Sequence, residues 1–187
     1  MSGQKRNLVI VPGLGDRVGL YKFCKPFWSM LGYSVYIYSF GWESQSRSLK
    51  ELQSDLMEYA RKLGVCDMIG ASAGGTAVIN TLVSCPLIVS RVITVCTPYQ
   101  ELSSLKNELL KKSLKNSISS LETINDEMKN RIHSAYALWD GVVATKYSQP
   151  GTVRRIKLFS IGHGFTICLA LTLYSGKLNR ALSENVL

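Results

Sequence analysis

The stretch Gly70-Ala71-Ser72-Ala73-Gly74-Gly75 decides the fold of this chain. It follows an apolar run at residues 65–69 and precedes a helical pattern over residues 76–83. A strand that passes into a helix through so short a turn crowds the residues on both sides of it. Glycine relieves that crowding because it has no side chain. The sequence therefore predicts a strand, a sharp turn at Ser72 and a helix.

This order of elements is the context of a nucleophile elbow. Gly70 and Gly74 would allow the turn that holds the Ser72 hydroxyl above the end of a sheet. The first N–H groups of the following helix would point at the reacting centre. A tight turn without chemistry is the alternative for the pattern alone, so the rest of the chain has to decide between them.

Composition is typical of one globular domain, which we expect to span residues 1–187. The chain is 46% hydrophobic and 19% charged, as in ordinary soluble proteins. An odd number of cysteines without a C-x-x-C pair favours buried thiols in a reducing compartment. No secretory cleavage site follows Met1, so we expect a cytoplasmic protein. The five cysteines are Cys24, Cys66, Cys85, Cys96 and Cys168.

The net charge of +9 raises the question of a nucleic-acid partner. The cations are scattered, and no aromatic residues alternate with them as a base-stacking surface requires. The densest cluster, at Lys106, Lys111, Lys112 and Lys115, is interpreted as a solvated face. We therefore expect no nucleic acid, and at most a weak attraction to an anionic membrane surface. The apolar run at residues 165–174 is far shorter than the ~20 residues of a membrane span, and it predicts a buried helix.

Strand patterns alternate with helical patterns along most of the chain, which predicts an α/β fold of about six mostly parallel strands with helices on both faces. The expected strands are residues 7–11, 34–40, 65–69, 91–96, 132–139 and 154–161. The expected helices are residues 21–31, 48–63 and 76–83, with a last helix from about residue 165.

One interval, residues 98–129, has no strand pattern but has leucines at amphipathic helical spacing. An ordinary crossover helix is one interpretation. The other is a short helical lid over the site at residues 99–129.

A serine nucleophile requires a base, and the base requires an acid that orients it. The chain has two histidines. His133 begins a strand pattern, which favours a structural role, whereas His163 lies between two glycines directly after the last strand. Asp140 follows the fifth strand, so Ser72, Asp140 and His163 would stand in chain order at the ends of successive strands. The rival acids are Asp16, Asp67, Glu122 and Asp126.

The loop Pro12-Gly13-Leu14-Gly15 follows the first strand at the same expected sheet edge. Backbone N–H groups of Leu14 and Ala73 are the candidates for an oxyanion hole, which stabilises charge on a carbonyl oxygen. The loop lacks the third glycine of a dinucleotide site and the Gly-Lys of a phosphate-binding loop. No cluster of ligand residues indicates a metal, and we expect no cofactor.

With these four motifs in this order, residues 7–173 resemble the α/β-hydrolase superfamily, in particular its small lipase and esterase members with almost no cap. The resemblance implies Ser72 as nucleophile, Asp140 as acid, His163 as base and the loop at Gly13 and Leu14 as oxyanion loop. Thr97-Pro98 also resembles a lipase feature. The chain departs from the family pattern at two places. The family often has His-Gly where this chain has Pro12-Gly13, and often a histidine or a larger residue where Ala71 and Ala73 flank Ser72.

We expect hydrolysis of carboxylic esters of small-molecule or lipid-like acyl groups, through an acyl-enzyme intermediate. A thioesterase, an amidase or an acyltransferase on the same triad is the alternative, as is a non-catalytic interaction module that keeps the fold. Trp28, Trp42 and Trp139 would either line the pocket or pack in the core. Trp139, beside Asp140, is the best candidate for a neighbour of the site, but core packing is the favoured interpretation.

Overall fold

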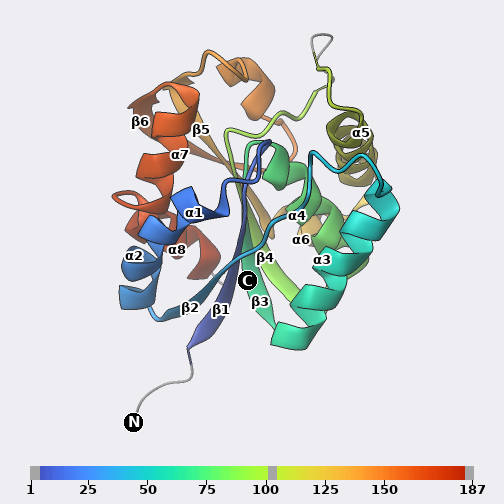
Figure 1. Ribbon diagram of the computed structural model, residues 1–187. Helices are drawn as coiled ribbons and strands as arrows, with labels where there is room; N and C mark the ends of the chain where they lie inside the picture. Colours follow the sequence, from blue (N-terminus) through green and yellow to red (C-terminus); the bar gives the residue numbers. More distant parts are fainter. Residues whose placement is uncertain (1–4, 101–104, 184–187) are drawn as a thin grey trace.

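The computed structural model describes residues 5–100 and 105–183, which form three layers with a six-stranded sheet in the middle (Figure 1). The strands are β1 (Arg6–Val11), β2 (Tyr33–Ile37), β3 (Cys66–Ala71), β4 (Val89–Val95), β5 (Ile132–Trp139) and β6 (Arg154–Ile161). The helices are α1 (Val18–Tyr21), η1 (Lys22–Cys24), α2 (Lys25–Met30), α3 (Leu49–Leu63), α4 (Ala73–Ser84), α5 (Glu108–Thr123), α6 (Asp126–Lys129), η2 (Thr145–Ser148), α7 (His163–Leu171) and α8 (Ser175–Ser183).

All neighbouring strands are parallel, in the order β2-β1-β3-β4-β5-β6. The predicted α/β fold with six parallel strands is confirmed. The chain moves from β1 to one edge and then returns to build the other side, so the order reverses between β1 and β3. Open α/β sheets generally bind ligands at such a reversal, outside the carboxyl ends of the strands.

Alternation along β1 explains why both faces of the sheet are covered. Leu8 and Ile10 join one apolar cluster, under α2, α7 and α8, while Val9 and Val11 join the other, under α3, α4 and α5. Successive side chains of a strand point to opposite faces, so a strand buried on both sides is apolar throughout. Figure 1 shows α1, α2, α7 and α8 on one side of the sheet and α3 to α6 on the other.

The prediction of a single helix over residues 21–31 is wrong. The structure has three short helices in this region, α1, η1 and α2. Pro26 stands within the first two positions of α2, where a missing N–H is tolerated because that donor has no partner inside the helix. The proline therefore begins a helix at a point where the hydrophobic pattern predicts the middle of one.

The second strand is shorter than predicted, because it ends at Ile37 rather than at residue 40. The backbone N–H groups of Phe40, Gly41 and Trp42 turn toward the carboxylate of Asp16 instead of continuing the ladder. Gly41 has a φ of 85° in this turn, a conformation that glycine adopts readily. The apolar pattern continues, but a contact from a distant loop redirects the backbone.

The interval at residues 98–129 holds two helices, α5 and α6, while residues 101–104 lie outside the described part. Leu110, Leu114 and Leu121 of α5 are buried, and the helix packs against α4. Asn80 of α4 donates a hydrogen bond to the Ser113 carbonyl over 3.1 Å. These contacts describe a helix seated on the sheet layer; movement as a lid stays a hypothesis.

The last predicted helix begins at His163, two residues early, and the chain continues as α7 and then α8. Ile167, Ala170 and Leu171 face the core, but Phe165 is 60% exposed and Leu173 76% exposed. The prediction of a wholly buried helix over residues 165–174 is therefore wrong at both ends. No helix in the described ranges is long and apolar enough to cross a bilayer.

Candidate active site

Ser72 is the single residue between β3 and α4. Its backbone, at φ 52° and ψ −121°, lies in a region that residues with side chains rarely adopt, and such conformations are retained where surrounding structure enforces them. A Cβ at Gly70 would collide with the Gly74 carbonyl, and one at Gly74 would collide with the Val11 carbonyl. The sharp turn and the need for glycine on both sides are as the sequence predicts.

Hydrogen bonds from two neighbouring elements hold the turn in this conformation. The Ser72 N–H donates to the Val95 carbonyl of β4 over 2.8 Å. The Thr97 hydroxyl donates to the Ser72 carbonyl over 2.8 Å. Thr97 also lies where a Cβ on Gly75 would be, so the Thr97-Pro98 segment packs directly under the elbow.

The predicted oxyanion loop lies against the serine side chain. A Cβ built on Gly13 would stand 2.9 Å from the Ser72 Cβ and 3.4 Å from its Oγ, so glycine is required for this approach. Ala73 is the first residue of α4, and its N–H therefore has no partner within the helix. Leu14 follows Gly13 with its side chain 48% exposed.

Asp16 fixes this loop to the segment after β2. Its two carboxylate oxygens accept hydrogen bonds from the backbone N–H groups of Phe40, Gly41 and Trp42. The Trp42 indole donates in turn to the Pro12 carbonyl over 3.2 Å. Hydrogen bonds to an ionised carboxylate are stronger than neutral ones, so Asp16 is a positioning residue for the loop that carries Gly13 and Leu14.

Asp140 and His163 meet at the carboxyl ends of β5 and β6. Nδ1 of His163 lies 2.7 Å from Oδ2 of Asp140, and their side chains are 15% and 2% exposed. The other oxygen of Asp140 accepts from the N–H groups of Val142 at 2.8 Å and Val143 at 3.0 Å. With Nδ1–H donating to the carboxylate, Nε2 is the ring nitrogen left to act as a base.

Opposing effects act on the pKa of Asp140. Burial raises the pKa, but the hydrogen bonds from His163, Val142 and Val143 favour the charged form and together hold the pKa below its usual value. The carboxylate is therefore ionised at neutral pH and stabilises a protonated imidazole beside it.

Cys96 is a neighbour of this pair that the sequence pattern did not single out. It follows β4 at φ 53° and is fully buried. Burial raises the pKa of its thiol, and the charge of Asp140 and a hydrogen bond with that carboxylate raise it further. The thiol is thus neutral, and its sulfur lies within 4.8 Å of a carboxylate oxygen of Asp140. The only signal in the sequence is its place at the end of the strand next to β5.

Ligand atoms of Cys96, Asp140 and His163 lie within 4.8 Å of one another, a spacing that a metal ion could use. Nδ1 of His163 is already bonded to Asp140, however, and both Cys96 and Asp140 are buried. A metal ion here would have to break the bond that orients the imidazole. The arrangement fits an acid–base pair better than a metal centre.

The structure does not bring all three candidates into hydrogen-bond contact. Within the described ranges, 5–100 and 105–183, no hydrogen bond joins the Ser72 hydroxyl to the His163 ring. Ser72 and the Asp140–His163 pair nonetheless stand at the same edge of the sheet, at the carboxyl ends of β3, β5 and β6. In enzymes without bound substrate such contacts are often long and shorten when substrate binds.

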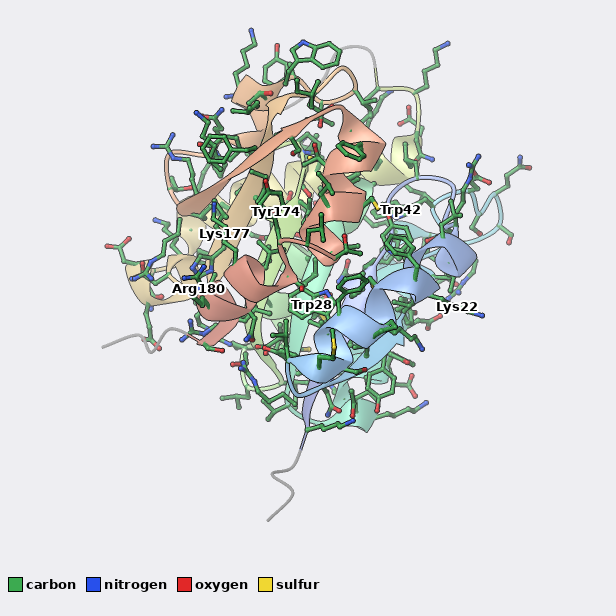
Figure 2. The ribbon with its side chains drawn as sticks, turned by 90° about the vertical axis from the view of Figure 1, so that its left-hand side faces the viewer. Lys22, Trp28, Trp42, Tyr174, Lys177 and Arg180 are labelled. Carbon is green, nitrogen blue, oxygen red and sulfur yellow. The ribbon has the colours of Figure 1, made fainter. Side chains whose placement is uncertain are left out.

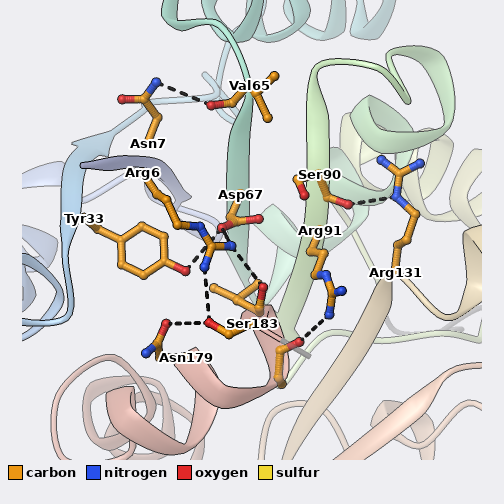
Figure 3. Close-up of polar contacts among 12 residues, drawn as sticks. Arg6, Asn7, Tyr33, Val65, Asp67, Ser90, Arg91, Arg131, Asn179 and Ser183 are labelled. Atoms are coloured by element: carbon orange, nitrogen blue, oxygen red, sulfur yellow. Dashed lines mark hydrogen bonds and ion pairs between the residues drawn. The ribbon is translucent and has the colours of Figure 1, made fainter. Parts of the chain in front are cut away.

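The rival acid Asp67 lies at the opposite end of β3. It accepts from Arg6 at 2.5 Å and from the Tyr33 hydroxyl at 3.2 Å, and Figure 3 shows this group beside Ser183 of α8. Five residues of extended strand separate Asp67 from Ser72, which is roughly 17 Å. Burial raises the pKa of Asp67, and the Arg6 charge opposes that effect.

The other rivals are also committed elsewhere. Asp16 binds backbone N–H groups, Asp126 begins α6 and pairs with Lys129 at 3.6 Å, and Glu122 is exposed on α5. The second histidine, His133, is buried in β5 near the amino ends of the strands. Asp140 is therefore the acid that contacts His163.

Two exposed apolar residues adjoin the candidate site residues in the sequence. Trp139 is 61% exposed and Phe165 60% exposed, next to Asp140 and His163 respectively. The expectation that Trp139 packs in the core is wrong, whereas Trp28 and Trp42 are fully buried. The pairing of β5 with β6 shifts in register between Ala137 and Trp139, which no local pattern predicts.

Comparison with known proteins shows the fold. A scan against family models and a search of curated proteins find no match. Among solved structures, the ydeN gene product of B. subtilis aligns with a TM-score of 0.71 at 15% identity, over 96% of this chain and 100% of that one. A monoacylglycerol lipase from Paleococcus ferrophilus aligns at 0.70 and 11% identity, over 95% and 94%. Est1E from Butyrivibrio proteoclasticus aligns at 0.68 and 12%, over 97% and 90%.

These structures have the α/β-hydrolase fold, so the expectation of that fold is confirmed. At such low identity the likeness extends to the fold alone. The chemistry of this chain has to be argued from its own residues.

Proposed function

We propose that the protein is a serine hydrolase that cleaves carboxylic esters, with Ser72 as nucleophile, His163 as base and Asp140 as the orienting acid. The observation that carries the proposal is the 2.7 Å contact between Asp140 and His163, at the same sheet edge as the strained Ser72 turn. An ion pair alone could be purely structural, and a strained serine alone could be no more than a turn. An acyl-transfer site requires both at the same end of the sheet, where the carboxyl ends of the strands meet.

In the first step, Nε2 of His163 takes the proton of the Ser72 hydroxyl while the oxygen attacks the ester carbonyl carbon. Negative charge moves to the carbonyl oxygen, which the N–H groups of Leu14 and Ala73 would stabilise by several kcal/mol. When the tetrahedral intermediate collapses, the bond to the alcohol breaks and His163 returns the proton to the leaving oxygen. The products are the free alcohol and an acyl group on Ser72.

In the second step, His163 takes a proton from water as the water oxygen attacks the acyl carbon. The bond to Ser72 then breaks and His163 gives the proton back to the serine oxygen, which releases the carboxylic acid. Asp140 stays ionised throughout and stabilises the imidazolium in both steps. No resident cofactor is part of the proposal.

The exposed apolar side chains beside the site support an apolar acyl group. Leu14, Trp139 and Phe165 lie next to the oxyanion loop, the acid and the base, where they could contact an acyl chain. Thioester, amide and acyl-transfer chemistry on the same triad, and a non-catalytic module with this fold, are the alternatives. The proposal also includes a small-molecule or lipid-like acyl substrate and no nucleic-acid partner. Five free cysteines support a reducing, cytoplasmic setting.

Hydrolysis of p-nitrophenyl esters from acetate to palmitate tests the proposal, with labelling by a fluorophosphonate as the second readout. We expect turnover and labelling in the wild type, and neither in Ser72→Ala. Ser29→Ala, at an exposed serine, is the matched control and should behave as wild type.

Labelling without ester turnover would move the assignment to thioesters, amides or acyl transfer. Absence of both turnover and labelling would favour the interaction module. Activity that survives in Ser72→Ala would overturn the proposed nucleophile.

A further inference from the structure

Exposed side chains run along the whole length of the edge strand β6. Arg155, Lys157, Phe159 and Ile161 alternate with Ile156, Leu158 and Ser160, and every member of the first set is exposed. Phe159 is 68% exposed and Ile161 62% exposed. Side chains two apart on a strand share a face, so Arg155, Lys157 and Phe159 form one row. Beyond this row the register shifts, and Ile161 pairs with Trp139 at the carboxyl end of the strand. We call these exposed residues, Arg155, Lys157, Phe159, Ile161 and Trp139, the β6 face.

Its apolar end adjoins the candidate active site. Trp139 is the register partner of Ile161 across the β5–β6 pair, so their side chains are neighbours on one face. Asp140 directly follows Trp139, and His163 is two residues beyond Ile161. The Lys157 ammonium lies 5.8 Å from the centre of the Phe159 ring, which joins the cationic and apolar halves.

The cationic half continues around the edge of the sheet onto α8. A hollow of about 440 Å³ lies there, and the Lys177 ammonium donates to the Lys157 carbonyl over 2.7 Å. Figure 2 shows Lys177 and Arg180 close together on the side of the molecule away from Lys22. The hollow is lined by His133, Arg154, Arg155, Ile156, Lys157, Lys177, Arg180 and Ala181.

Charge in this part of the chain is of one sign. Residues 141–183 contain six lysines and arginines and no aspartate or glutamate. The cations are Lys146, Arg154, Arg155, Lys157, Lys177 and Arg180. Exposed large apolar side chains that are bordered by charge are typical of an interaction site, and the adjacent charge selects an anionic partner.

We propose that the β6 face docks the protein on an anionic lipid bilayer. Lys and Arg would contact lipid headgroups, while Trp139, Phe159 and Ile161 would enter the boundary between headgroups and acyl chains, as aromatic and basic residues do at membrane surfaces. A second copy of the chain is a poor occupant, because a symmetric contact would bring the same cations together. The net charge of +9 adds a long-range attraction to the same surface.

Docking in this way would place the Asp140–His163 pair at the lipid surface. The binding itself needs no catalysis, so it stands apart from the proposed function, and Ser72→Ala should bind vesicles as the wild type does. Loss of turnover with binding retained would therefore contradict only the hydrolase proposal.

Sedimentation with vesicles measures the docking. We expect the protein to bind vesicles of phosphatidylcholine with about 30% phosphatidylserine, to bind pure phosphatidylcholine weakly, and to dissociate as salt rises. The double variant Arg155→Glu/Lys157→Glu should bind the anionic vesicles about tenfold or more weakly. These side chains are exposed, so folding should be retained, and circular dichroism would check it.

The matched control is Lys112→Glu/Lys115→Glu, on the exposed side of α5, across the molecule from β6 (Figure 1). It changes the net charge by the same amount and should lose far less binding. Equal loss in the two double variants would mean that total charge, rather than the β6 face, drives binding, and would overturn the proposal.

Trp139 supplies a direct readout of the apolar half. Trp28 and Trp42 are fully buried, so a blue shift of tryptophan emission on vesicle binding would come from Trp139. The shift should disappear in Trp139→Phe and weaken in Phe159→Ser/Ile161→Ser. Failure to bind anionic vesicles, or a dimer in solution that Phe159→Ser disrupts, would overturn the proposal, the latter by assigning the face to a second copy.

Discussion

Oδ2 of Asp140 stands 2.7 Å from Nδ1 of His163, a contact made because β5 and β6 are parallel neighbours that end at the same edge. This relationship links the stability of the fold to pH as well as to catalysis.

Burial raises the pKa of Asp140, but its hydrogen bonds outweigh that effect and the folded-state pKa is lowered. Ionised Asp140 therefore stabilises the folded protein above the unfolded-state pKa of about 3.9, and this contribution is lost as pH falls through the lower folded value. Asp140→Asn should be less stable than wild type at pH 6, with the difference shrinking below about pH 4. Urea unfolding of both proteins from pH 3 to 6 measures it; a difference independent of pH would contradict the assignment.

Ser72→Gly is expected to separate stability from activity. The φ of 52° and ψ of −121° strain any residue with a Cβ, and relief of such strain is worth about 1–3 kcal/mol. Ser72→Gly should thus raise the melting temperature relative to Ser72→Ala, which keeps the Cβ, while both lack turnover. Equal melting temperatures would mean that the turn is not strained.

Cys96 is expected to act through Asp140. Cys96→Ala removes a neutral thiol beside the carboxylate and should lower kcat several-fold with KM little changed, because the change acts on the orienting acid. Cys96→Ser keeps a donor and should restore most of kcat. If Ala and Ser variants lose activity equally, with a parallel loss of stability, the residue is merely packed.

Gly74 and Gly176 form a matched pair for the close approach of α4 to β1. A Cβ on Gly74 would meet backbone carbonyls of Val11 and Pro12, whereas one on Gly176 in α8 has open space. Gly74→Ala should destabilise the fold by about 2 kcal/mol or more, as overpacking does, while Gly176→Ala should stabilise it by about 0.5–1 kcal/mol through helix propensity. Denaturant midpoints for the two variants compare these effects directly.

Asp16 offers a test of the oxyanion loop at a distance from the reacting atoms. Asp16→Asn leaves one acceptor for the three backbone donors of residues 40–42, which should loosen the loop at Gly13. We expect a fall in kcat of about tenfold or more, in line with a displaced oxyanion donor, and slower fluorophosphonate labelling. Normal labelling would mean that the loop keeps its position without the carboxylate.

The elements predicted best from sequence are those set by local pattern. The strand at residues 154–161 and the turn at Ser72 follow from alternation and glycine spacing, and the structure has both. Chain order at successive strand ends singles out Asp140 and His163 as candidates, although the contact between them is a tertiary fact.

The features that sequence did not predict depend on contacts between distant segments. Trp139 is exposed at a register shift between two strands, and the early end of β2 follows from Asp16. Cys96 looked like any buried cysteine, because its role depends on which strand lies beside β4. Periodicity reports which residues are apolar, but it cannot report which neighbour they meet.

The strand order has a consequence for how activity arises during folding. β1 and β3 lie inside the sheet, yet β5 and β6, which bring Asp140 and His163 together, are added at one edge by the last part of the chain. Parallel pairings between distant segments form slowly, because long loops must close first. Recovery of the proposed turnover after dilution from denaturant would thus lag behind the recovery of helical signal, because the site is complete only when the final strand has docked.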